Sequence, residues 1–233
     1  MADVAVLLSG GLDSAVLVAQ AARTAVVQPI YVSAGLAWEP EERALVERLL
    51  HSPPYASGVL PLAALAADVT DVYPASHWAR RGAPPAYDTP DEDVYLPGRN
   101  LLLLAKAGVL CALRGIPRIA IGPLAGNPFP DATPEFLASM AQTLSSGLAH
   151  PIAIDAPFSA MHTEGVIALG VSLGVPFELT MSCMKPAGGR HCGLCSKCRE
   201  RRDGFSAARV ADPTEYLAAS PRGTDSQLTT HNS

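Results

Sequence analysis

The stretch Ser9-Gly10-Gly11-Leu12-Asp13-Ser14 decides the fold of this chain. It follows an apolar run from residue 4 to residue 8, which predicts a fully buried strand of a parallel sheet. Residues 15–23 are rich in alanine and free of glycine and proline, and they predict a helix. Both glycines can adopt a positive φ and bring backbone N–H groups close to an anion, which the positive end of the helix dipole then faces. Asp13 and Ser14 also lie where a helix N-cap is expected.

The glycine stretch lacks the features of two other phosphate-binding motifs. The G-x-x-x-x-G-K-[ST] run of a nucleoside-triphosphate P-loop does not occur in the chain, and no G-x-G-x-x-G fingerprint follows the first predicted strand. Its place between a first strand and a first helix nevertheless favours phosphate binding over a plain glycine turn. We therefore predict a phosphate site formed by Leu8 and the six residues of the stretch.

Length and composition predict one α/β domain with a small appendage. The chain has 233 residues, of which 48% are hydrophobic and 17% charged, enough for a sizeable core. A net charge of −5 does not favour non-specific nucleic-acid binding, and only three lysines occur: Lys106, Lys185 and Lys197. No apolar run reaches the roughly 20 residues of a membrane helix, and no basic segment precedes residues 2–8 as it would in a signal peptide. We expect a cytoplasmic protein.

Strand and helix signals alternate along the chain. Strands are predicted at residues 4–8, 25–33, 58–65, 116–121, 151–155 and 175–180, and helices at residues 15–23, 39–51, 101–114 and 163–173. This alternation predicts a doubly wound, mostly parallel, Rossmann-like sheet with right-handed crossovers. The proline-rich segment 74–90 is either a binding loop or a surface insertion. Residues 221–233 are polar and without periodicity, and we expect a disordered tail there.

Two further turns are expected close to the glycine stretch. The sequence Leu96-Pro97-Gly98-Arg99-Asn100 precedes the helix at 101–114 and places Arg99 where it could pair with a phosphate; the alternative is a capped helix with a solvent-exposed arginine. Gly122 follows the strand at 116–121. Because ligands of open parallel sheets bind beyond the carboxyl ends of the strands, Gly122 is expected beside the glycine stretch.

Another loop enters a helix at Thr133-Pro134. Thr133 is a candidate N-cap, with Pro134 at the first helical position. The nearby carboxylates of Asp131 and Glu135 could therefore be purely structural.

A C-x8-C-x2-C-x2-C pattern near the C-terminus is formed by Cys183, Cys192, Cys195 and Cys198. Two-residue spacing lets thiolates converge on one ion, and four protein ligands make a closed, structural site. The pattern favours zinc in a reduced cytoplasm, while an iron–sulfur cluster, which also uses C-x2-C-x2-C runs, stays open. His191 could replace one sulfur, although it is adjacent to a ligand and more often a bystander. Cys111 lies in an apolar helix and is expected in the core.

Together these motifs resemble the ATP pyrophosphatases (PP-loop enzymes) and, among them, the 7-cyano-7-deazaguanine synthase family of the queuosine pathway. The resemblance runs from about residue 3 to residue 205. It rests on SGGLDS at 9–14, LPGRN at 96–100, FPD-x-x-PEF at 129–136, APF at 156–158, TMSC at 180–183 and CGLCSKCRERRDGF at 192–205. It implies an adenine nucleotide alpha hydrolase type of fold, with a PP-loop domain at residues 1–180 and a four-cysteine zinc-binding segment with a helix at residues 181–210.

The resemblance also implies a reaction. ATP would adenylate the carboxylate of 7-carboxy-7-deazaguanine, ammonia would displace AMP to give an amide, and a second ATP would dehydrate the amide to the nitrile, with Mg²⁺ shielding the phosphates. Family members are commonly homodimers. The implied catalytic residues are Asp13, Ser14 and Arg99. The implied ATP-binding residues are Leu8, Ser9, Gly10, Gly11, Leu12, Asp13, Ser14, Gly98, Arg99, Asn100 and Gly122. The implied substrate-binding residues are Asn127, Phe129, Asp131, Glu135 and Phe136.

The chain departs from the family pattern at several positions. Asn127 and Phe129 stand where the family usually has Asp and Tyr, and Thr163 stands where a lysine is expected. The segment Ser33-Ala34-Gly35-Leu36 replaces a Gly-Gln pair. One alternative is therefore a divergent relative that stops at an amide or joins the activated acid to another amine.

Two more distant alternatives are a tRNA sulfur transferase and a non-catalytic, zinc-bearing binding module. The first is disfavoured because the chain has neither a basic appendage nor a second thiol near Cys111. The second is disfavoured because Ser9, Asp13 and Arg99 are all retained.

Overall fold

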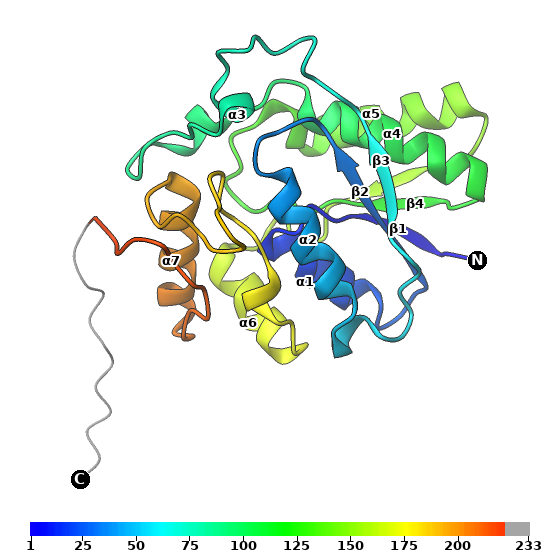
Figure 1. Cartoon of the computed structure of the whole chain (residues 1–233). Coiled ribbons are helices and arrows are strands. Elements are labelled where there is room, and N and C mark those ends of the chain that lie inside the picture. Colours follow the sequence, from blue (N-terminus) through cyan, green and yellow to red (C-terminus); the bar gives the residue numbers. More distant parts are fainter. Residues whose placement is uncertain (222–233) are drawn as a thin grey trace.

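A computed structural model describes residues 1–221, which form a five-stranded parallel sheet with helices on both faces (Figure 1). The strands are β1 (Val4–Leu7), β2 (Val27–Ser33), β3 (Ala63–Ala66), β4 (Arg118–Ala120) and β5 (Ala153–Asp155). Their order is β3-β2-β1-β4-β5, and every pairing is parallel. The chain crosses to the other side of β1 between β3 and β4, so the predicted doubly wound fold is confirmed. Ligands of such sheets bind where this crossing opens a crevice between neighbouring strand ends.

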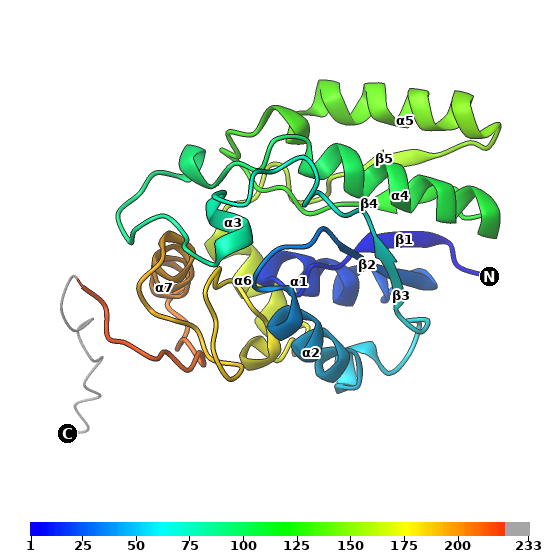
Figure 2. The ribbon, with the colours of Figure 1, turned by 45° about the horizontal axis from the view of Figure 1, so that its top comes forward.

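The helices form one layer on each face of the sheet (Figure 2). One face carries α1 (Leu12–Ala21), α2 (Glu39–Leu50) and α6 (Thr163–Ser172), and α7 (Ser196–Ala208) packs against α6. The other face carries α4 (Arg99–Arg114) and α5 (Pro134–Leu148), while the short α3 (Trp78–Arg81) lies in the segment after β3. Successive residues of β1 point to opposite faces, so Val4 and Val6 belong to the first core and Ala5 and Leu7 to the second.

A third apolar cluster extends the core beyond the carboxyl ends of the strands. It joins Trp38 and Leu96 from the loops to Met181 and the cysteines of the C-terminal segment. The backbone N–H of Met181 donates to the carbonyl of Gly10 at 2.8 Å. The start of the C-terminal segment is thus fixed directly to the glycine stretch.

The strand predicted at residues 175–180 is wrong. The N–H of Val175 donates to Gly170 at the end of α6, and a 3₁₀ turn follows at Phe177–Leu179. The hydroxyl of Thr180 donates to the carbonyl of Phe177 at 2.7 Å. These local bonds use the groups that a sheet partner would need, so the chain turns instead of pairing.

Two other expectations need correction. The third strand begins at residue 63 rather than 58, because Pro61 has no N–H to donate and only Val59 pairs earlier, in a single bridge to β2. The N-cap of α1 is Gly11, with φ −69° and ψ 162° and no side-chain cap, so neither Asp13 nor Ser14 caps the helix. Of the two glycines, only Gly10 has a positive φ, at +82°.

Several local predictions are confirmed. The hydroxyl of Thr133 accepts from the N–H of Phe136 at 3.2 Å, with Pro134 as the first residue of α5. Cys111 is fully buried on α4, which starts two residues earlier than expected, at Arg99. Apart from Pro221, the predicted disordered tail lies outside the described residues. Within residues 1–221 no helix is long and apolar enough to cross a membrane.

Candidate functional site

The glycine stretch turns sharply between β1 and α1. At Gly10 a Cβ would lie 2.8 Å from a methyl group of Val46, and the positive φ excludes most other residues as well. The hydroxyl of Ser14 donates to the carbonyl of Gly11 at 3.0 Å and lies 3.3 Å from the hydroxyl of Ser9. The bend therefore leaves the first N–H groups of α1 facing the crevice at the end of β1, where the positive end of the helix dipole also acts.

The turn before α4 brings an arginine to the same crevice. Gly98 has a φ of +75° and is the N-cap of the helix, so Arg99 occupies the first helical position. Its guanidinium Nε is buried and has no hydrogen-bond partner among the described residues. The carboxylate of Asp131 accepts from the backbone N–H of Asn100 at 2.9 Å and from its side-chain amide at 3.3 Å. Asp131 thus fixes the turn that presents Arg99.

Two adjoining cavities open at this crevice, with volumes of about 220 Å³ and about 300 Å³. The residues that line both are Ser9, Gly11, Asp13, Glu42, Arg99 and Phe129. The first cavity continues along the strand ends between Ile30, Val32 and Ile121. The second continues toward the C-terminal segment, past Trp38 and Trp78, whose rings stack 5.8 Å apart, to Lys197 on α7.

Two carboxyl groups of this crevice are strongly desolvated. Burial raises the pKa of Asp13 to about 6, although the ammonium of Lys197 and the guanidinium of Arg201 favour its ionised form. Asp13 Oδ1 has no hydrogen-bond partner among the described residues. Burial also raises the pKa of Glu42 to about 8, with Arg99 acting in the opposite direction. The hydroxyl of Tyr31 donates to Glu42 Oε2 at 2.9 Å. Both carboxyl groups therefore hold a proton more readily in this crevice than they would in water.

Most residues expected to bind ATP converge on the crevice. The first cavity is lined by Leu8, Ser9, Gly11, Asp13, Ser14, Arg99, Asn100 and Gly122. Leu12 lines the second cavity, while Gly10 and Gly98 shape the two turns. A Cβ on Gly122 would lie 3.7 Å from that of Asp13, so the turns after β1 and β4 are neighbours as expected.

The residues expected to bind substrate are dispersed. Asn127 and Phe129 line the first cavity, and the side chain of Asn127 accepts from the N–H of Phe129 at 2.9 Å. Glu135 is exposed in the first turn of α5, and Phe136 packs against the second core. Neither these two nor Asp131 lines either cavity. Thr163, at the position where a lysine was expected, lines the second cavity.

Sequence reasoning missed several lining residues. Tyr31 and Glu42 line the first cavity, and Trp38, Trp78, Lys197 and Glu200 line the second. Two signals were available. The end of the second predicted strand lies next to the glycine stretch in any doubly wound sheet, and Trp78 lies in the long proline-rich segment, where binding loops are common.

The four clustered cysteines form a compact sulfur site. Their Sγ atoms all lie within 4.8 Å of one another, with separations of 3.9 Å from Cys192 to Cys198 and 3.5 Å from Cys195 to Cys198. A tetrahedral zinc with Zn–S distances of about 2.3 Å spaces its sulfurs about 3.8 Å apart. Cys183 accepts two backbone N–H bonds at 3.2 Å, from Lys185 and Cys192. This donor set fits a tetrahedral metal ion.

The thiols of the cluster are electrostatically coupled. Contacts with the other sulfurs, first of all with Cys183, lower the pKa of Cys192 and Cys195, the latter to about 7. The same contacts raise the pKa of Cys183 and Cys198. All four residues could ionise together at this spacing only if a cation compensated their charge. His191 lies outside the sulfur group; burial lowers its pKa to about 3, and its Nε2 accepts from the N–H of Ser182 at 3.1 Å.

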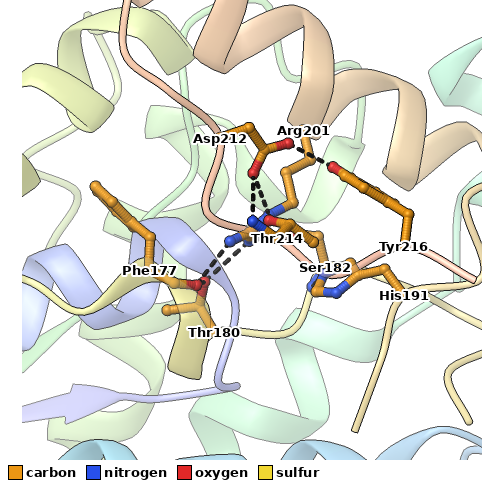
Figure 3. Close-up of polar contacts among 8 residues, drawn as sticks. All are labelled: Phe177, Thr180, Ser182, His191, Arg201, Asp212, Thr214 and Tyr216. Carbon is orange, nitrogen blue, oxygen red and sulfur yellow. Dashed lines mark hydrogen bonds and ion pairs between the residues drawn. The ribbon is translucent and has the colours of Figure 1, made fainter.

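Arg201 on α7 holds the C-terminal segment together (Figure 3). Its guanidinium donates to the carbonyl of Phe177 at 2.7 Å and to the hydroxyls of Thr180 at 2.9 Å and Ser182 at 3.1 Å. Its Nε donates to the hydroxyl of Thr214 at 2.5 Å. The side chain is 1% exposed, so this arginine is a buried, fully engaged structural cation.

Comparisons with known proteins identify relatives over almost the full chain. Residues 3–209 match the family described as "Queuosine biosynthesis protein QueC". A 7-cyano-7-deazaguanine synthase of Anaeromyxobacter dehalogenans (strain 2CP-C) is 34% identical over 222 residues, covering 91% of this chain and 94% of the relative. One of Methanopyrus kandleri is 33% identical, covering 93% of this chain and 100% of the relative.

Solved structures show more distant likenesses. A predicted subunit of tRNA methyltransferase from Methanocaldococcus jannaschii is 17% identical with a TM-score of 0.45, covering 73% of this chain and 75% of that chain. A U34-tRNA thiolase NcsA from Methanococcus maripaludis, solved with its [4Fe-4S] cluster, is 14% identical with a TM-score of 0.45, covering 94% and 76%. The family model and the curated relatives, by contrast, span nearly the whole sequence. This chain therefore belongs to the QueC family of queuosine biosynthesis proteins, whose curated relatives are named 7-cyano-7-deazaguanine synthase.

Proposed function

We propose that this chain is an ATP-dependent ligase that converts 7-carboxy-7-deazaguanine and ammonia to 7-cyano-7-deazaguanine. Adenylation of the carboxylate releases pyrophosphate, and ammonia then displaces AMP and leaves the amide. A second ATP adenylates the amide oxygen, and loss of AMP yields the nitrile. Each product molecule thus accounts for two ATP, two AMP and two pyrophosphate. The names of the relatives support this proposal.

The observation that carries the proposal is the pair of unsatisfied charged groups at the glycine stretch. Asp13 Oδ1 and Arg99 Nε are both buried without a hydrogen-bond partner among the described residues, and both residues line both cavities. Native proteins seldom leave buried charged groups unpaired unless a ligand completes them. A phosphate chain fits Arg99 and the N-terminus of α1, because both attract anions.

The two cavities suit two substrates that react at their shared wall. The apolar strand ends of the first cavity suit the adenine and ribose of ATP, with its phosphates at the glycine stretch. The aromatic side chains of the second cavity suit a planar, bicyclic acid. Since Ser9, Gly11 and Asp13 line both cavities, the carboxylate and the α-phosphate would meet there, where their fixed orientation would accelerate the reaction. Mg²⁺ bound with ATP would neutralise phosphate charge, and Asp13 is the carboxylate placed to hold it.

The remaining assignments complete the proposal. The cysteine cluster holds one structural zinc, residues 1–180 form the catalytic domain and residues 181–210 form the zinc-binding segment. We also propose a cytoplasmic homodimer with small-molecule substrates and no nucleic-acid partner. Light scattering at several protein concentrations tests the dimer, and elemental analysis tests the zinc against iron.

The deciding experiment incubates the protein with ATP, Mg²⁺, 7-carboxy-7-deazaguanine and ammonium and follows the products by mass. We expect the nitrile with two AMP per turnover. Arg99→Gln should lose most of this activity, whereas Arg23→Gln, an exposed arginine just beyond the far end of α1, should retain it. Formation of the amide alone, with one AMP per turnover, would contradict nitrile formation. It would favour the divergent relative, the alternative that the departures at Asn127, Phe129 and Thr163 suggest. No AMP with any deazaguanine acid would instead favour the binding module.

A further inference from the structure

Lys197 is a cation of the second cavity whose hydrogen-bond donors are only partly used within the protein. Lys197 lies in the first turn of α7, and of the chain's three lysines it is the one that lines either of these cavities. Its ammonium donates to Glu200 Oε2 at 2.7 Å, and its side chain remains 28% exposed. An ammonium has three N–H donors, so two of them remain for a ligand.

Two other cations line this cavity, and both are placed differently from Lys197. The guanidinium of Arg201 is occupied by Phe177, Thr180, Ser182 and Thr214, and its side chain is 1% exposed. Arg99 lies at the wall shared with the first cavity, next to the glycine stretch. Thr163, the residue of α6 that lines the second cavity, offers only a hydroxyl. Away from the shared wall, an anion in the second cavity therefore meets Lys197 as its accessible cation.

The cysteine cluster determines where Lys197 lies. Cys195 is the N-cap of α7 and Cys198 is in its first turn, so Lys197 is flanked by two of the four sulfurs. Cys195 and Cys198 are both essentially unexposed, which anchors this turn firmly in the third apolar cluster. A long, flexible side chain is thus carried on a rigid turn that faces the glycine stretch.

We propose that Lys197 binds the carboxylate of the acid substrate in the second cavity and directs it toward Asp13 and the glycine stretch, with the cysteine cluster as the device that positions this lysine. The assignment rests on the proposed function. Two features of the cavity support it: the stacked rings of Trp38 and Trp78 offer a flat apolar surface for a heteroaromatic ring, and Lys197 offers the charge that a carboxylate attached to that ring would need. Lys197 would act before adenylation, because the acid is an anion only until it is activated.

The test compares the two half-reactions in Lys197→Gln and Lys197→Arg. Loss of a charge-assisted hydrogen bond should raise KM for the acid roughly tenfold or more in Lys197→Gln, while KM for ATP stays unchanged. When the neutral amide intermediate is supplied instead of the acid, its conversion to the nitrile should be almost unaffected. Lys197→Arg should restore most of the affinity for the acid. Lys106→Gln, on an exposed position of α4, serves as the control.

The outcomes separate this inference from the proposed function. If the unmodified chain forms the nitrile but Lys197→Gln keeps its KM for the acid, the function holds and Lys197 is not the carboxylate site. An equal loss of activity with the acid and with the amide would also overturn the inference, because it would indicate a general structural effect. In that case the metal content of the variant is expected to fall. If the unmodified chain consumes neither acid nor amide, the proposed function fails and the inference fails with it.

Discussion

Replacing Asp13 by asparagine should stabilise the folded protein while abolishing turnover. The carboxyl group of Asp13 is desolvated in the crevice, and this burial raises its pKa from 3.8 to about 6. The folded state therefore holds a proton more tightly than the unfolded state does. The stabilisation that this proton provides is greatest below the pKa of Asp13 in the unfolded chain, and it is lost as the pH rises from about 4 to about 6. A pKa raised this far corresponds to a cost of about 3 kcal/mol at pH 7 in the native protein.

The asparagine side chain has no charge to desolvate, so the variant avoids this cost. Its amide N–H groups need partners, and leaving them unpaired would cancel about 1–3 kcal/mol of the gain. That loss does not depend on pH, so the pH dependence of the difference between variant and wild type is the diagnostic quantity. For a domain of this size, about 3 kcal/mol corresponds to a change in Tm of about 6–12 °C between pH 4 and pH 7.

Thermal unfolding without nucleotide at pH 4, 5, 6 and 7 measures this quantity. The stability of the variant relative to the wild type should rise mainly between pH 4 and pH 6 and change little from pH 6 to pH 7, and the variant should form no AMP at any pH. Asp71→Asn, at an exposed position, should show a constant difference. On this reasoning, Asp13 is a buried, uncompensated carboxylate that lowers stability. A Tm difference between Asp13→Asn and the wild type that does not change with pH would refute it.

Three further outcomes are expected. Gly170→Ala drives a Cβ into the ring of Phe177 and should lower stability by about 1–3 kcal/mol in denaturant titrations. Gly147→Ala, with open space around it on α5, should instead raise stability by up to about 1 kcal/mol. Cys198→Ser should release the metal and lower Tm, and a chelator should do the same to the wild type, as metal analysis and calorimetry would show. Glu42→Gln should become more stable relative to the wild type as the pH rises from about 4.5 to about 8, because burial raises this pKa; the same Tm difference at pH 5 and pH 8.5 would contradict it.

The sequence predicted the sheet well because its strongest signals are local. The run before Gly10 and the alternation of strands and helices follow from periodicity and glycine placement, and all but one of the predicted strands exist in the structure. Residues 175–180 failed because an apolar run of that length fits a strand or a buried turn equally well. Which one forms depends on the local hydroxyl bond from Thr180 to Phe177 and on the bond from Arg201 to the same carbonyl, and the second of these is a tertiary contact.

The candidate site was predictable where the spacing of residues along the sequence is enough to indicate what they bind. The cysteine cluster and the glycine stretch have that property. The positions of Lys197 and Trp78 in the lining of the second cavity could not be predicted, because they depend on distant segments meeting beyond the strand ends. Asp131 illustrates the opposite case. Its carboxylate accepts from Asn100, a contact across 31 residues of sequence that makes it a support for the arginine turn rather than a cavity residue.

The bond between Gly10 and Met181 has a consequence for the order in which the crevice is assembled during synthesis. The carbonyl of Gly10 leaves the ribosome early, but its partner N–H lies 171 residues further along the chain (181 − 10). At roughly 5–20 residues per second, the partner follows after on the order of 10–30 s. A nascent chain thus displays its glycine stretch long before the segment that braces it, and the crevice is completed only after residue 181 has been synthesised. A chain truncated before residue 181 therefore lacks this brace on its glycine stretch.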